Sequence, residues 1–248
     1  MIMFVGEHRG DGGLVLGKIG NSGIVVVIAA LNEEKGIGPT ISEVRDILGD
    51  ACFLVVDGRS VDRTVDVAKG FGADVCTQRG RGKGQAISEA VEHISRVNGN
   101  PSYVVFIDAD YTYPAAYVPA MIKILESDPS IGMVIGNRFN GNYNVGNSMR
   151  NVYYFGNRLL ALAHRLASGV NIEDPLSGLR VARWSLLKDW KVKSMGFDVE
   201  AELNFYIAKR GYRIIEVPIE YRPRIGEKKL KLKHGFTILR RIVSEALF

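Results

Sequence analysis

Residues 23–31 read GIVVVIAAL, an uninterrupted apolar run that carries no alternating polar side chains. Short runs of Val and Ile are typical of a strand that is buried on both faces of a sheet. Similar runs recur along the chain, and segments with helical periodicity separate them. This alternation predicts an α/β fold in which helices cover a mostly parallel sheet. We expect further strands at residues 52–56, 73–77, 103–107, 132–135 and 213–221, and helices at residues 39–48, 62–70, 84–97, 117–126, 151–168 and 199–211.

The length and composition favour one large domain. The chain has 248 residues, 46% of them hydrophobic, and we find neither repeats nor a linker composition. Its longest apolar run, 24–31, is far shorter than the ~20 residues that a membrane-spanning helix needs. We expect a flexible glycine-rich leader at 1–22, an α/β domain at 23–228 and a basic amphipathic helix at 229–248.

The positive charge is concentrated near the C-terminus. The chain carries a formal charge of +5, and residues 222–241 contain eight Lys or Arg and a single acid, Glu227. A nucleic-acid-binding protein more often spreads basic residues over one face and interleaves aromatic side chains for base stacking. We therefore expect no nucleic-acid partner. Cys52 and Cys76 both lie in strand-like runs and are predicted to be buried thiols in a reducing compartment.

Two acids follow the predicted strand at 103–107 directly. They form the motif Asp108-Ala109-Asp110. Residues i and i+2 at a strand end point the same way, so both carboxylates can converge on one divalent cation. Such an ion would neutralise the charge that develops on a departing diphosphate. A solvated acidic turn would have the same sequence, so this motif alone does not decide between the two.

Polar groups also follow the first two predicted strands, at Asn32-Glu33-Glu34 and at residues 57–64. Acids at this edge can accept hydrogen bonds from a nucleoside, whereas Asn32 and Ser60 can equally serve as turn or cap residues. The glycine-rich segment 79–85 precedes a helix, where backbone N–H groups and Lys83 can attract phosphate. It lacks the GxxxxGK[ST] spacing, which argues against an ATPase.

The order of these motifs resembles that of the family 2 glycosyltransferases, which have the GT-A (Rossmann-like) fold. Within that family the chain looks most like the dolichyl- or polyprenyl-phosphate mannose or glucose synthases. The resemblance rests on Asn32-Glu33, residues 57–64, Gly82-Lys83-Gly84, Asp108-Ala109-Asp110 and Gly136-Asn137-Arg138, and is extended by residues 174–180, 196–202 and 224–230.

The resemblance implies a role for individual residues. It implies Asp108 and Asp110 as ligands of Mg²⁺ or Mn²⁺, and the same two acids with Arg138 as catalytic residues. Acceptor phosphate would be bound by Arg138 and Arg150. The donor, a GDP- or UDP-linked sugar, would be bound by Ala30, Asn32, Glu33, Asp57, Lys83, Ala109, Arg224 and Lys229.

The chain departs from the family pattern at three places. Gly58 and Arg59 replace the acid and glycine of the commoner Asp-Asp-Gly-Ser form. Thr112 stands where mannose synthases tend to carry Gln as a metal contact. Lys228 stands where Ser usually precedes the lysine at 229.

The expected reaction is an inverting transfer of a sugar to a dolichyl or polyprenyl phosphate. A phosphate monoester is already ionised near neutral pH, with a second pKa of about 6, so it can attack without a protein base. The alternatives are a soluble transferase with a small phosphorylated or hydroxylated acceptor, and a nucleotide-sugar-binding protein without catalysis. The intact pair of Asp108 and Asp110 argues against the latter.

The C-terminal segment has the pattern of an amphipathic helix. Apolar residues recur every three or four positions, and Lys231, Lys233, Arg240 and Arg241 flank the stripe. This pattern predicts a helix on the anionic cytoplasmic face of a membrane, and hence a peripheral protein. A terminal helix packed on the domain is the alternative. The apolar positions are Phe236, Leu239, Ile242 or Val243, and Leu247.

Overall fold

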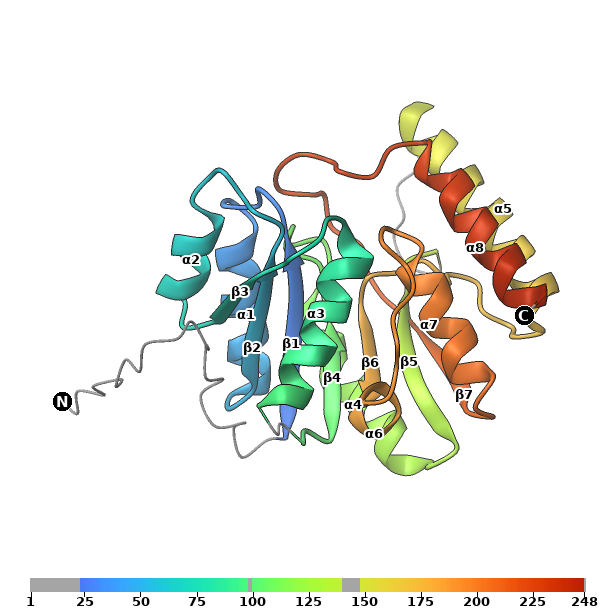
Figure 1. The fold of residues 1–248 in the computed structure, drawn as a ribbon, viewed down its shortest axis with the longest axis horizontal. Coiled ribbons are helices and arrows are strands. Elements are labelled where there is room, and N and C mark those ends of the chain that lie inside the picture. Colours follow the sequence, from blue (N-terminus) through green and yellow to red (C-terminus); the bar gives the residue numbers. More distant parts are fainter. Residues whose placement is uncertain (1–22, 98–99, 140–147, 248) are drawn as a thin grey trace.

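The run that begins the domain forms β1 (Ile24–Ala30), which lies inside a seven-stranded sheet. The computed structural model describes residues 23–97, 100–139 and 148–247, so the predicted leader at 1–22 lies outside the described residues. The strand order is β3-β2-β1-β4-β6-β5-β7 (Figure 1). The other strands are β2 (Cys52–Asp57), β3 (Asp74–Thr77), β4 (Tyr103–Phe106), β5 (Ile131–Asn137), β6 (Arg180–Arg183) and β7 (Arg213–Pro218).

The sheet is mostly parallel, as predicted, with one exception. β6 runs antiparallel to both of its neighbours, β4 and β5, whereas the remaining neighbours pair in parallel. This strand was not predicted, because residues 180–183 include two arginines and make no apolar run. β7 lies at one edge of the sheet, where Pro218 is tolerated because proline cannot donate a ladder hydrogen bond.

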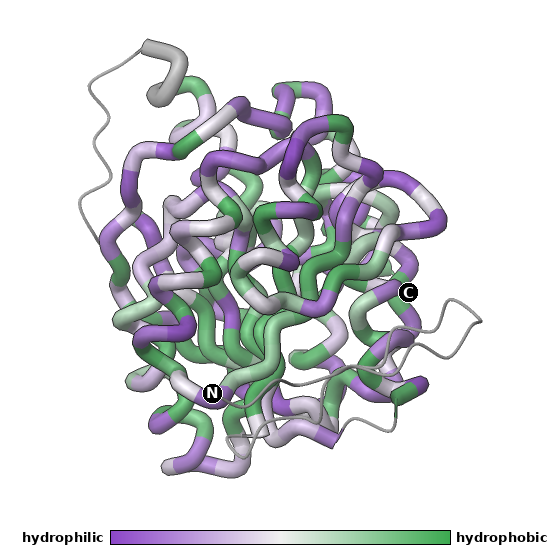
Figure 2. Tube along the Cα trace, turned by 90° about the vertical axis from the view of Figure 1, so that its left-hand side faces the viewer, coloured by the Kyte–Doolittle hydropathy of each residue, from purple (hydrophilic) through white to green (hydrophobic). Residues whose placement is uncertain are grey.

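Helices cover both faces of the sheet. One face packs against α1 (Ile37–Leu48), α2 (Thr64–Gly70), the 3₁₀ turn η1 (Ala115–Tyr117) and α4 (Val118–Ser127). The other packs against α3 (Lys83–Arg96), α6 (Trp184–Leu187) and α7 (Val199–Ala208). Val26 and Ile28 face the first layer, and Val25 and Val27 face the second, so β1 is buried on both sides. The strands form the hydrophobic centre in Figure 2.

A pair of helices forms a further layer beyond α7. α5 (Ser148–Ser168) and α8 (His234–Leu247) lie side by side along one edge of the molecule (Figure 1). Ile238 and Ile242 of α8 pack against Leu160 of α5 and against Ala201 and Phe205 of α7. α7 is therefore buried on several sides, and its buried residues include the polar Glu200, Glu202 and Asn204.

Both cysteines are reduced and partly buried. Burial raises the pKa of the Cys76 thiol to about 11, so this thiol stays protonated at neutral pH. The chain thus carries no disulfide.

Candidate active site

A cleft of about 940 Å³ opens where β1, β2 and β4 end. Ala30 pairs with Asp57 and Val27 with Phe106 in parallel registers, so the carboxyl ends of these strands meet at one edge of the sheet. Ligands bind at such an edge in open α/β folds. The cleft extends from there to α5 and α8, where Tyr153 and Ile238 line it. The motifs that follow separate strands in the sequence therefore border one space.

Asp108 and Asp110 both line this cleft just beyond β4. Asp110 is 3% exposed, and the Thr112 hydroxyl donates to its Oδ1 atom at 2.6 Å. Tyr111 adopts a positive φ of 63°, which turns the chain sharply after the second acid. A side chain at Gly178 would overlap the Asp108 carboxylate, so this glycine leaves the space that the carboxylate occupies. The hydrogen bond from Thr112 therefore fixes the orientation of Asp110, and Gly178 makes the position of Asp108 possible.

The pKa values of the two acids are shifted in opposite directions. Burial opposes the ionisation of Asp108, but the charge and hydrogen bond of Lys83, together with the charges of Arg138 and Arg224, outweigh burial and lower the pKa of this carboxyl. Burial and the nearby charge of Asp108 raise the pKa of Asp110. When two like charges lie close together in a buried site, the pKa values of the two groups move apart in this way.

Lys83 is the first residue of α3 and bridges two acids. Its Nζ atom lies 2.6 Å from Asp108 Oδ1 and 2.7 Å from Glu200 Oε1. Gly82 and Gly84 flank it, and a Cβ atom on either would overlap the backbone at 194–195. These glycines therefore allow close packing of two backbone segments, and the approach of phosphate that the sequence suggested stays a prediction.

Asn32 and Asp57 hold the loops that follow β1 and β2. Asn32, at φ 50°, accepts a hydrogen bond from the Val61 amide at 2.8 Å, and its own amide donates to Ser60 Oγ. Asp57 is 2% exposed and accepts from the amides of Arg59 and Ser60. Neither Asn32 nor Asp57 is among the residues that line the cleft, whereas Ala30, Glu33 and Ala109 are.

The loop after β7 crosses the cleft and binds its acids. Arg224 pairs with Glu33 and, at 3.0 Å, with Asp110 Oδ2. Lys229 Nζ lies 3.2 Å from the Asn32 carbonyl oxygen and 3.9 Å from Glu33. Burial raises the pKa of Glu33 to about 7 although both cations oppose the shift. Arg224 and Lys229 therefore line the cleft near the strand ends, and the donor-binding role that the family resemblance implies for them stays a prediction.

Arg138 lines the cleft but is already paired. Its Nε and Nη2 atoms each lie 2.7 Å from an oxygen of Asp174, and its amide donates to the same carboxylate. The fork-to-fork geometry fixes the guanidinium plane, which also faces the Tyr221 ring. Arg150 falls within α5, but its side chain lies outside the described residues.

Several residues of this site were not predicted from the sequence. Glu200 holds Lys83, and Asp174 holds Arg138; both lie in motifs that the family resemblance identified, but neither was given a role. The Tyr113 hydroxyl accepts a hydrogen bond from the Gly178 amide at 2.7 Å. Tyr153 carried no signal, because its place in the cleft depends on how α5 packs.

The cleft combines a carboxylate pair with a ring of cations. Among the described residues, no third Asp, Glu, His or Cys joins Asp108 and Asp110 in a metal-binding cluster. No histidine or cysteine is among its lining residues either. The described groups can therefore bind anions and supply two hard oxygen ligands, but they include no usual nucleophile. The cations that line the cleft are Lys83, Arg138, Arg222, Arg224, Lys228 and Lys229.

In sequence, this chain is similar to two glycosyltransferases of Haloferax volcanii. Its dolichyl-phosphate hexose transferase is 34% identical over 84% of this chain and 86% of that protein. Its glycosyltransferase AglJ is 37% identical over 81% of this chain. The chain spans only 63% of the length of AglJ.

Solved structures of glucosyl-3-phosphoglycerate synthase from Mycobacterium tuberculosis have the same fold. The complex with Mn²⁺, UDP-glucose and phosphoglyceric acid superimposes with a TM-score of 0.72 at 25% identity, over 91% of this chain and 80% of that one. The complex with Mg²⁺ and UDP gives a TM-score of 0.68 at 26% identity, over 90% of this chain and 78% of that one.

The profile of the family called Glycosyl transferase family 2 matches residues 25–189. That match contains the ends of β1, β2 and β4, and with them both acids of the cleft. The fold, the relatives and the profile agree: the chain is a glycosyltransferase and belongs to glycosyl transferase family 2.

Proposed function

We propose that this enzyme transfers a hexose, with inversion, from a nucleoside diphosphate sugar to the phosphate of a polyprenyl or dolichyl lipid. The main support for this proposal is that the cleft extends from the strand ends to α5 and α8. It joins a carboxylate pair and several cations at the strand ends to an apolar end beside α5 and α8. A sugar nucleotide fits the first end and a lipid phosphate the second. The named hexose transferase of Haloferax volcanii supports the same acceptor class.

Asp108 and Asp110 fit a divalent cation. They offer oxygen ligands, which Mg²⁺ and Mn²⁺ prefer, and the lack of a side chain at Gly178 lets the Asp108 carboxylate keep its position. Two protein ligands leave positions for the oxygens of a diphosphate. A bound ion would supply electrophilic stabilisation of the leaving diphosphate. The related synthase was crystallised with Mn²⁺ in one structure and with Mg²⁺ in another, which supports this choice of metals.

The side chains of the cleft would hold two anions close together. Lys83, Arg224 and Lys229 lie at the donor end, and Arg138 faces the acceptor side with its guanidinium fixed by Asp174. We also retain Arg150 as an acceptor residue. An ionised acceptor phosphate needs no general base, which agrees with the lack of a histidine among the described lining residues. Direct displacement at the anomeric carbon inverts its configuration.

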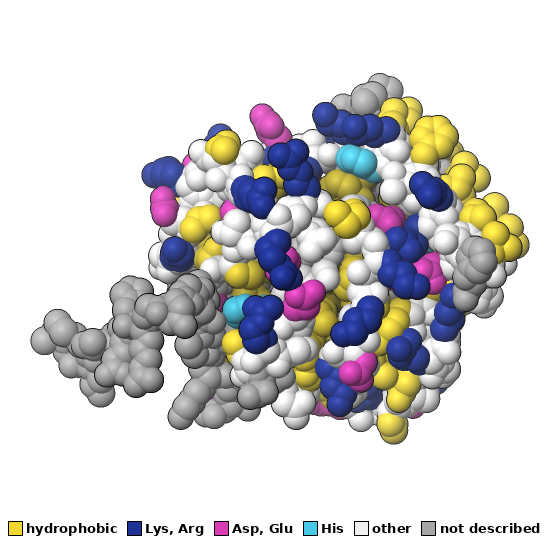
Figure 3. Space-filling model, in the orientation of Figure 1, with side chains coloured by type: hydrophobic (Ala, Val, Ile, Leu, Met, Phe, Trp, Pro, Cys, Tyr) yellow, Lys and Arg dark blue, Asp and Glu magenta, His cyan; other side chains and the backbone are white. Residues whose placement is uncertain are grey.

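The outer face of α5 and α8 suits a membrane surface. Figure 3 shows hydrophobic side chains gathered along the edge where these helices lie. α5 exposes one apolar stripe and α8 a second, while Ile238 and Ile242 of α8 pack inward. Among the described helices, none is long and apolar enough to cross a bilayer. The exposed residues are Val152, Phe155, Leu159, Leu162 and Leu166 of α5, and Phe236, Leu239, Val243 and Leu247 of α8.

These stripes support peripheral binding to an anionic leaflet on the cytoplasmic side. Two parallel stripes offer more apolar area than the single one predicted for α8, and the basic residues Lys231, Lys233 and Arg240 lie beside them. Each basic residue near an anionic surface contributes about 1 kcal/mol. The apolar end of the cleft opens next to this pair of helices, so a lipid phosphate could enter the cleft from the surface.

A small phosphorylated acceptor is the second candidate. It is favoured by the complex of the structural relative with phosphoglyceric acid. An acceptor panel separates the two. The donors to be tested with Mn²⁺ are UDP-glucose, UDP-N-acetylglucosamine and GDP-mannose. From the donor that proves active, we expect sugar transfer to a short polyprenyl phosphate and little to phosphoglyceric acid. Transfer to phosphoglyceric acid alone would overturn the lipid acceptor in favour of the small one.

A further inference from the structure

One cation of the cleft has no acidic partner among the residues that the structure describes. Lys83 pairs with Asp108 and Glu200, and the four other cations that line the cleft also lie within 4.0 Å of a carboxylate oxygen. For Lys228, no carboxylate of the described residues lies within that distance. A lysine that borders an anion-binding cleft without an internal counter-ion is available to an anionic ligand.

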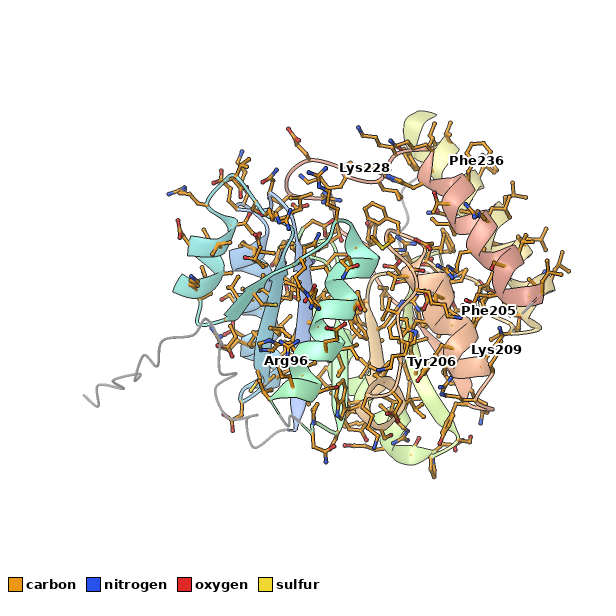
Figure 4. The ribbon with its side chains drawn as sticks, viewed as in Figure 1. Arg96, Phe205, Tyr206, Lys209, Lys228 and Phe236 are labelled. Carbon is orange, nitrogen blue, oxygen red and sulfur yellow. The ribbon has the colours of Figure 1, made fainter. Side chains whose placement is uncertain are left out.

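The Lys228 side chain has a defined place. Its Nζ atom lies 2.9 Å from the centre of the Tyr153 ring, a cation–π contact. The Tyr153 hydroxyl donates to the Leu230 carbonyl oxygen at 3.3 Å, which fastens this loop to α5. Figure 4 shows Lys228 on the loop between the sheet and the α5–α8 pair. Tyr153 thus holds the ammonium group at the mouth of the cleft.

This place belongs to the acceptor half of the cleft. Tyr153, Leu230 and Ile238 line the end beside α5 and α8, whereas the donor motifs lie at the strand ends. Partial burial and the charges of Arg224 and Arg138 lower the pKa of Lys228 to about 8. These neighbours create a positive potential that a bound dianion would relieve.

We propose that Lys228 binds the phosphate monoester of the acceptor, with its ammonium group positioned by the ring of Tyr153. The inference rests on the proposed transfer to a phosphate and names a specific residue for the recognition of that phosphate. Arg138 is held by Asp174, so Lys228 would supply a cation that no acid in the described part of the chain has neutralised. The shared ligand chemistry is a phosphate monoester, on either a prenyl chain or a small molecule.

Steady-state kinetics of matched variants test this role. The variants are Lys228→Gln, Lys228→Arg and, as a control for charge loss, Lys188→Gln at an exposed position outside the cleft. For whichever acceptor the wild type uses, farnesyl phosphate or phosphoglyceric acid, Lys228→Gln should raise the acceptor KM about tenfold or more. Its donor KM should stay within about twofold, Lys228→Arg should recover most of the loss, and Lys188→Gln should match the wild type.

An unchanged acceptor KM in Lys228→Gln would overturn the proposal. An equal rise of the donor KM would overturn it too, because Lys228 would then act on the diphosphate. If the wild type uses neither acceptor, the proposed function fails and binding decides the role of Lys228. Calorimetry with decyl phosphate should then show wild-type binding that Lys228→Gln weakens about tenfold. Equal affinities, or no binding to the wild type, would refute the assignment.

Discussion

At the residue scale, Asp108 and Asp110 leave β4 two positions apart and are held by different partners. Lys83 neutralises the first acid, and Thr112 and Arg224 hold the second. If these acids bind the metal, Asp108→Asn or Asp110→Asn should lower transfer at least about a thousandfold, because charge on the leaving diphosphate would go unbalanced. Activity assays measure the loss, and circular dichroism checks that each variant is folded. The control is Asp189→Asn, at an exposed position outside the cleft. Full activity in either variant would refute the assignment.

Gly178 offers a subtler test of the same site. A methyl group there would meet only Asp108 side-chain atoms at the closest contacts, so Gly178→Ala should displace that carboxylate and spare the backbone. We expect the apparent metal affinity, measured as the Mn²⁺ dependence of activity, to fall about tenfold or more. Gly70→Ala, where nothing lies within 4 Å, should leave it unchanged. Equal Mn²⁺ dependence of both variants would show that metal binding does not need the Asp108 carboxylate in its present position.

At the element scale, α8 serves the fold and, in our proposal, the membrane at once. Its inner residues Ile238 and Ile242 are buried, whereas Phe236 is 77% exposed. Deleting the helix would therefore damage packing, and point substitutions test the outer face better. Phe155→Ser combined with Phe236→Ser should lower partitioning onto anionic vesicles more than tenfold, since each Phe contributes about 2 kcal/mol when buried.

The matched control for the membrane face is Val61→Ser. Val61 is 91% exposed, but it lies in the loop after β2, away from α5 and α8. Vesicle flotation of this variant should equal that of the wild type. Equal partitioning of the double variant and the wild type would contradict membrane binding through these helices.

Helix α5 also carries a buried histidine that should make stability depend on pH. His164 is fully buried and packs on Phe205 of α7, and burial followed by the charge of Arg180 lowers its pKa to about 4. The unfolded chain binds this proton near pH 6.5, so stability that is complete above pH 6.5 is lost as the pH falls towards 4. The loss should reach about 2 kcal/mol at pH 5.

Urea unfolding at pH 7 and pH 5 measures this loss. In His164→Leu, the difference in unfolding free energy between the two pH values should be smaller than in the wild type by that amount. The same difference in both proteins would show that His164 does not carry the pH dependence.

At the scale of the whole molecule, the sequence predicted the sheet and the main helices because buried parallel strands leave long apolar runs. It missed β6, whose two arginines serve the interior: Arg180 donates to Asn204 Oδ1 at 2.6 Å and Arg183 to the Ile131 carbonyl oxygen at 2.8 Å. The family resemblance assigned Glu33, Asp108, Asp110 and Arg224 to one site, and all four line the cleft, whereas Asn32 and Asp57 do not.

Pairings between distant segments could not be predicted. Arg138 meets Asp174 across 36 positions, and Lys228 meets Tyr153 only because the loop after β7 lies against α5. Such contacts depend on tertiary packing, which leaves no local pattern in the sequence. They decide which cations are neutralised within the protein and which remain available to a substrate.

The nature of the product tests the account most directly. The enzyme, Mn²⁺ and the donor that proves active should be incubated with a short polyprenyl phosphate, and the product examined by ¹H and ³¹P NMR. We predict a sugar joined through its anomeric carbon to the lipid phosphate, with the configuration opposite to that in the donor. A product with retained configuration, or a sugar linked to any group other than the phosphate, would contradict the account.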